Sequence, residues 1–259
     1  MFSKGGSWNT AKYWRIPAAV SLILVVISAT VTVSPGVLRY VGSGHLDISL
    51  YYASLSMIVA GLLVMSLVLR YEYTFHGPKE VAVIGALSAL SAASRLVIPI
   101  PNVKPCTFLI IVTGYVFGPD AGIMIGILTP AVSNMFLGQG YWTFWQMLMW
   151  AIAGWSGSLL RKRFPNISIE ALAAYAFIWG FLFGTPLDFA TWLSLNANVS
   201  ILPAIMVAGV PWNLLDGIGN LLFVLLAGRY TISILERYKR RFEIHYLDSE
   251  AQKEYLSIR

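Results

Sequence analysis

Long runs of apolar residues, separated by short polar stretches, make up most of this chain. The runs do not alternate between apolar and polar positions, and this favours helices over the strands of a membrane barrel. Several of them approach the roughly 20 residues that a membrane-spanning helix needs. The pattern predicts an all-α integral membrane protein with eight helices, at residues 17–33, 50–69, 81–98, 106–117, 120–137, 142–160, 169–191 and 204–228.

A polar segment, RYEYTFHGPKE at residues 70–80, divides these helices into two groups. We therefore expect residues 1–80 to hold a basic segment and an accessory transmembrane hairpin. Residues 81–229 would form a six-helix core, and residues 230–259 a basic and polar tail. The run at 106–117 is short for a straight span, so it is either packed steeply against its neighbours or re-entrant.

The composition agrees with a membrane protein and argues against an enzyme. The chain is 57% hydrophobic and 12% charged, with a mean hydropathy of +0.69, whereas soluble domains have about 25% charged residues. The lone Cys106 excludes an intramolecular disulfide and a multi-cysteine metal site. The sequence contains no GxxxxGK[ST] loop, HExxH motif or GxSxG motif. We expect no catalytic residue, no metal and no cofactor.

The basic residues predict the orientation of the chain. Eight helices place both termini on one side, and 15 of the 18 Lys and Arg residues then lie on that side. Arg39 and Lys104 lie on the other side, and Arg95 lies within a helix. The positive-inside rule therefore predicts cytoplasmic termini in the cell membrane, and it explains the net charge of +6 without invoking nucleic acid.

Arg95 is the most unusual charge, because it lies near the outer end of its predicted helix. A charge at this depth must snorkel to the headgroups, pair with another group or face a cavity. It is therefore a candidate anchor for an anionic group of a ligand, or a partner for the carboxylate of Asp188 or Asp216.

The outer loop that follows, Pro99–Pro105, holds three prolines and is stiff. It is either a tight connection or a rigid lid over a ligand, with Asn102 and Lys104 as the polar groups that contact it.

Amides and aromatic residues gather around the next outer loop. Aromatic residues at a membrane boundary ordinarily form a belt, and buried amides can join helices by hydrogen bonds. The same residue types also line pockets for planar ligands that carry amides. The candidates are Asn134, Gln139, Trp142, Trp145 and Gln146, with Asn213 of the last helix as a further residue that could reach the same cavity.

Small residues recur along one stripe of the helix predicted at 81–98, and such stripes let another helix approach closely. The stripe serves either internal packing or the docking of a partner subunit. Its residues are Ala82, Ala86, Ala89 and Ala93.

Three motifs in this region resemble one family: PNVKP at 101–105, GYVFGP at 114–119 and NMFLGQGYWTFWQ at 134–146. They are similar to the substrate-binding S components of energy-coupling factor (ECF) vitamin transporters, most of all to the branch that includes cobalamin carriers. Met135 departs from that branch's usual Asn-Phe-Phe, and the hairpin before residue 81 is not part of a standard S component. The resemblance implies a vitamin carrier that opens outward, is capped by the 99–105 loop and docks through the alanine stripe. Its partners would be a transmembrane T subunit and two cytoplasmic ATPases.

The resemblance favours cobalamin or a related corrinoid as the ligand, because amides and tryptophans suit the corrin rim. Pantothenate, folate or a queuosine precursor would use many of the same residue types. A stand-alone secondary transporter, with Arg95 and a carboxylate as its coupling pair, is a rival from another class, and a membrane enzyme or scaffold is a third.

Overall fold

The computed structural model describes residues 58, 61–62, 64–69, 71, 78–98, 100–195 and 199–240. This part of the chain contains helices and no strand, as the apolar runs predict. The described residues of the second predicted run are helical, whereas the run at 17–33 lies outside the described residues. The elements that follow are α5 (Pro78–Val97), α6 (Cys106–Phe117), α7 (Pro119–Leu137), α8 (Trp142–Arg163), α9 (Ile169–Ser194), η2 (Val199–Ile201), α10 (Leu202–Phe223) and the π-helical turn η3 (Val224–Gly228).

Among the residues that the structure describes, four stretches are long and apolar enough to cross a membrane: Pro78–Val97, Pro119–Leu137, Ile169–Ser194 and Val199–Arg240. The 22-residue helix α8 matches them in length but ends in three basic residues, Arg161, Lys162 and Arg163. The chain is therefore a multi-pass, all-α integral membrane protein.

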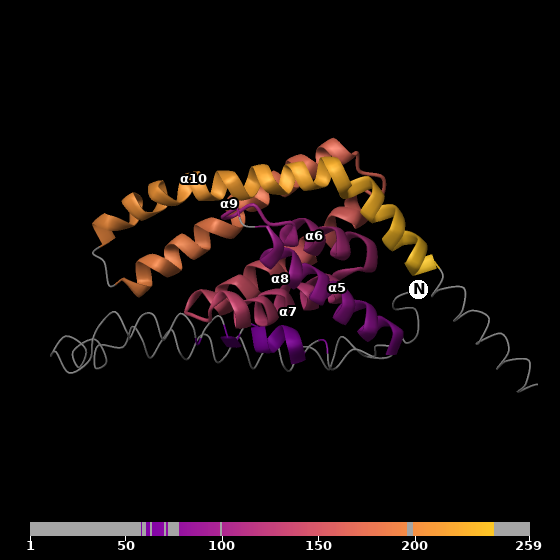
Figure 1. Ribbon diagram of the computed structural model, residues 1–259, viewed down its shortest axis with the longest axis horizontal. Helices are drawn as coiled ribbons and strands as arrows, with labels where there is room; N and C mark the ends of the chain where they lie inside the picture. The colour runs from indigo at the N-terminus through magenta and orange to yellow at the C-terminus, as the bar shows by residue number, and fades with distance from the viewer. Residues whose placement is uncertain are drawn as a thin grey trace, which may run out of the picture.

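The short helix α6 lies at the centre of the bundle (Figure 1). It contacts each of α5, α7, α8, α9 and α10, and its residues other than Leu109 are buried. Twelve residues rise only about 18 Å, less than the roughly 30 Å of a bilayer core. Helix α6 is thus a core element enclosed by longer helices.

Glycines bring α6 and α7 close to α8. A Cβ atom on Gly114 of α6 or on Gly122 of α7 would overlap the backbone carbonyl of Gly154 on α8. A Cβ atom on Gly126 would overlap the backbone of Trp150. The 118–119 break between α6 and α7, where Gly118 has φ 104°, turns both glycine faces towards the same helix.

Helices α9 and α10 lie side by side along one side of the molecule (Figure 1). They touch where Gly180 faces Gly217, since a Cβ atom on either residue would crowd the other helix. After α10, the turn η3 bends the chain, and a further helical stretch (229–240) continues to Arg240. Measured along the helix axis, the 42 residues from Val199 to Arg240 span roughly 60 Å. This length exceeds the thickness of the bilayer core.

Candidate functional site

Arg95 lies inside the helix bundle, with 8% of its surface exposed. Its Nη1 atom donates hydrogen bonds to Ser133 Oγ and, at 2.8 Å, to Asn134 Oδ1. The guanidinium also lies over the ring of Trp150, 4.7 Å from the ring centroid. Arg95 therefore neither snorkels nor forms an ion pair within the described part of the chain.

Both carboxylates considered as its partner bond elsewhere. Asp188 accepts a hydrogen bond from Asn213 Nδ2 at 3.0 Å, and Asp216 accepts one from Asn220 Nδ2 at 3.3 Å. Of the two alternatives for Arg95, the pairing with Asp188 or Asp216 is not formed, because amides of α10 bind these carboxylates and Arg95 faces α7 and α8.

Asn134 of α7 is the centre of this arrangement and is 1% exposed. Its carbonyl oxygen accepts from Arg95, and its Nδ2 donates to Thr143 Oγ1 at 3.1 Å and to Gln146 Oε1 at 2.8 Å. An amide offers two N–H donors, so both are used. Asn134 thereby joins α5, α7 and α8.

Further hydrogen bonds extend from the residues around Asn134 in two directions. Thr143 Oγ1 donates to Gln139 Oε1 at 2.9 Å, towards the loop between α7 and α8. On the other side, Trp150 Nε1 donates to Thr107 Oγ1 of α6 at 3.0 Å, and its ring stacks on Phe183 of α9 at 4.5 Å. We call the connected residues the buried polar network, in which Gln139 at the loop end is exposed and Gln146 is half-buried: Arg95, Thr107, Ser133, Asn134, Gln139, Thr143, Gln146 and Trp150.

The loop between α5 and α6 contacts α10 and does not join the network. Asn102 has a positive φ of 58° and is exposed, and its Nδ2 donates to the Trp212 carbonyl at 3.2 Å. Lys104 Nζ donates to the Ile98 carbonyl, within the loop. A Cβ atom on Gly219 of α10 would lie 3.2 Å from the side chain of Val103, so small residues let the loop approach this helix.

The remaining predicted site residues lie at the start of α8 and in α10. Trp142 is exposed and packs edge to face on Tyr141, with ring centroids 5.1 Å apart. Trp145 is half-buried, and its Nε1 has no hydrogen-bond partner among the described residues. Asn213 is buried against Asp188, in space left by glycines on α9 and α10. The structure thus joins Arg95 to Asn134, Gln139 and Gln146 by hydrogen bonds, whereas Asn102, Lys104 and Asn213 bond to other groups.

Sequence reasoning did not select Thr107, Ser133 or Trp150. One signal was available on α8, because Thr143, Gln146 and Trp150 are spaced by three and four residues and so share a helix face. Thr107 and Ser133 lie in apolar helices, where a lone hydroxyl gives no pattern.

The alanine stripe lies on the outside of α5. Ala82, Ala86, Ala89 and Ala93 are all exposed, whereas the buried residues of this helix are Ile84, Ser88, Ser91, Ala92 and Arg95. A Cβ atom on Gly85 would meet no atom within 4 Å. Within the described part of the chain, this face is not used for internal packing.

A model of the family described as "ECF-type riboflavin transporter, S component" matches residues 76–232, which is more than half of the chain. No solved structure matches this chain.

Proposed function

The chain belongs to the family of ECF-type riboflavin transporter S components, and we propose that it captures a vitamin at the outer face of the cell membrane. In this proposal it delivers the ligand inward as part of a complex with a transmembrane T subunit and two cytoplasmic ATPases. The family consists of membrane-embedded transporter subunits, which agrees with the absence of a nucleotide-binding loop in this sequence. Residues 81–229 would act as the substrate-binding core and residues 1–80 as an accessory region.

The observation that carries the proposal is the buried guanidinium of Arg95. Only Nη1 makes hydrogen bonds, so Nε and Nη2 hold N–H donors with no acceptor among the described residues. Removing a charge from water costs several kcal/mol unless other groups compensate it. A ligand that carries carbonyl or anionic oxygens would supply the missing acceptors, and Asn134 and Trp150 hold the guanidinium in a fixed position for it.

We propose a flavin as the ligand. A flavin ring is planar and presents carbonyl oxygens and ring nitrogens along one edge, which match an Arg–amide cluster. Its faces suit stacking on aromatic rings such as Trp142 and Trp145. The description of the matching family supports this choice.

Cobalamin or a related corrinoid is the second candidate. The resemblance of the 134–146 segment to cobalamin carriers favours it, and so does a buried cation that suits the phosphate of the nucleotide tail. Asn102 and Lys104 would contact either ligand from the loop, and Asn213 would do so from α10.

Native mass spectrometry of the full chain, extracted gently from vitamin-replete cells, tests the proposal. A retained flavin mass supports it, and a corrinoid mass supports the second candidate. Proteoliposomes then test the mode of transport, because an S component should import the ligand only with the T subunit, the ATPases and ATP. Uptake by the isolated chain that collapses with an ion gradient would overturn the proposal in favour of a secondary transporter.

A further inference from the structure

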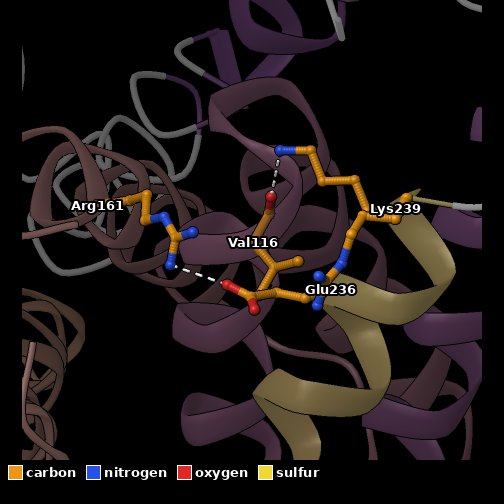
Figure 2. A pocket seen from close by; sticks show the side chains of 5 residues that line it. Val116, Arg161, Glu236 and Lys239 are labelled. Carbon is orange, nitrogen blue, oxygen red and sulfur yellow. Dashed lines mark hydrogen bonds and ion pairs between the residues drawn. The ribbon is translucent and has the colours of Figure 1, made fainter. Parts of the chain in front are cut away.

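A cavity separate from the buried polar network is drawn in Figure 2, and it lies at the ends of α6 and α8 that are predicted to be cytoplasmic. Its volume is about 320 Å³, and none of its lining residues belongs to the buried polar network. Val116 lines it from α6, Arg161 from α8, and Glu236, Lys239 and Arg240 from the helical stretch after η3. Three basic side chains and one acidic side chain give this lining a net positive formal charge.

The bend at η3 builds the cavity by bringing the helical stretch 229–240 against α6 and α8. Lys239 Nζ donates to the Val116 carbonyl at 2.8 Å, and Arg161 Nη1 pairs with Glu236 Oε1 at 2.9 Å (Figure 2). Arg161 also lies over the ring of Tyr115, 4.8 Å from its centroid. Basic groups from two different helices are therefore held around one opening.

The opposite face of the helical stretch 229–240 indicates the depth of the cavity in the membrane. Tyr230, Ile234 and Tyr238 recur every four residues and are exposed, so they form one apolar stripe. Tyrosines are enriched at the boundary between membrane and water. An apolar stripe with basic residues beside it is typical of a helix that lies in this boundary. The cavity then opens at the level of the lipid headgroups.

We propose that this cavity binds the phosphate group of an anionic phospholipid of the cytoplasmic leaflet. Basic pockets between transmembrane helices on the cytoplasmic side suit such headgroups, and Arg and Lys donors make charge-assisted hydrogen bonds to phosphate oxygens. Glu236 opposes the ligand electrostatically, and its bond to Arg161 partly neutralises that side of the opening. This site is independent of the vitamin proposed above.

Charge variants of the full chain in mixed detergent and lipid micelles test the proposal. Native mass spectrometry would count the phosphatidylglycerol and phosphatidylcholine molecules that stay bound. The variant Lys239→Gln/Arg240→Gln should reduce phosphatidylglycerol affinity about 25-fold, since each basic residue near an anionic surface contributes roughly fivefold. The matched control Arg229→Gln/Arg237→Gln removes two charges from the same helical stretch, outside the cavity lining, and should retain the lipid.

Glu236→Gln distinguishes binding from a purely structural role. Removing the carboxylate should strengthen phosphatidylglycerol retention, whereas a residue that only fastens the helix would weaken it when changed. The proposal is overturned if phosphatidylcholine is retained equally, or if the control variant loses as much lipid as the cavity variant. It is also overturned if inorganic phosphate occupies the cavity while no lipid stays bound, because the ligand is then a soluble phosphate.

Discussion

Replacing Arg95 with methionine should separate the contributions of this side chain to stability and to binding. Its hydrogen bond to Asn134 involves a charged donor and contributes about 1.5–3 kcal/mol. Its contact with the Trp150 ring adds about 2 kcal/mol when desolvated. Holding the charge out of water without a counter-ion costs several kcal/mol. With the second hydrogen bond, to Ser133 Oγ, included, the favourable and unfavourable contributions balance to within a few kcal/mol, so we expect Arg95→Met to fold with a modest change in its thermal midpoint when no ligand is present.

Binding of the ligand should respond very differently. Truncating one partner of a buried, charged contact costs about 2–5 kcal/mol, which is about 30-fold to 5,000-fold in Kd. Arg95→Lys keeps the charge but loses the planar fork and the ring contact, so its Kd should lie between those of Arg95→Met and the parent chain.

Isothermal titration calorimetry in detergent, with riboflavin and then cobalamin as titrant, measures these Kd values. Arg163→Met is the matched control, because Arg163 is exposed at the other end of α8. The reasoning is refuted if folded Arg95→Met binds the vitamin with unchanged Kd. It is equally refuted if Arg95→Met fails to fold while Arg95→Lys is stable, since the charge is then structural.

Four further variants test the site, the docking face and the packing. Trp145→Ala and Asn102→Ala should each weaken ligand binding about tenfold, or about 1.4 kcal/mol, without loss of folding, and calorimetry that finds no change in either would exclude the proposed outer site. Ala89→Leu should leave ligand binding intact but abolish uptake by the complete complex, because leucine blocks close helix approach; surviving uptake would place the docking face elsewhere. Gly154→Ala should cost about 1–3 kcal/mol or more through overpacking against α7, measured as a lower thermal midpoint. Gly85→Ala, with open space at its Cβ position, is the neutral control, and equal effects of the two would contradict the packing.

The sequence predicted the six core helices well because each is an apolar run, and most of these runs are followed by a proline, a glycine or a basic cluster; α9, which ends at Ser194 before Leu195 and Asn196, has no such signal. The 118–119 break separates α6 from α7 between the predicted runs at 106–117 and 120–137. The motifs around residues 101–146 indicated the S-component family, which the family model confirms. The cobalamin assignment stays a prediction.

The partners of Arg95 were not predictable, since they depend on how helices rotate about their axes. Apolar runs fix the length of a helix in a membrane but constrain its rotation weakly, because every face is apolar. Judged by depth in the membrane alone, both Asp188 and Asn134 could contact Arg95. The packing of α5 against α7 is what makes Asn134 its partner. The role of Thr107 could not be predicted for the same reason. Its hydrogen bond with Trp150 depends on the glycine contacts that bring α6 against α8.

The residues proposed for ligand binding and those proposed for partner docking lie on two different faces of α5. Arg95, on the buried face, is held by α7 and α8, while Ala89 and Ala93 lie exposed on the other face. A ligand that accepts hydrogen bonds from Arg95 would restrict the last turns of this helix further, because it would add contacts to those that Asn134 and Trp150 already make with the guanidinium. Small-residue interfaces depend on close backbone approach, so a helix fixed in position offers a better docking face than a mobile one. Occupancy of the binding site would thus strengthen docking through a single rigid element, and by linkage docking would strengthen ligand binding equally.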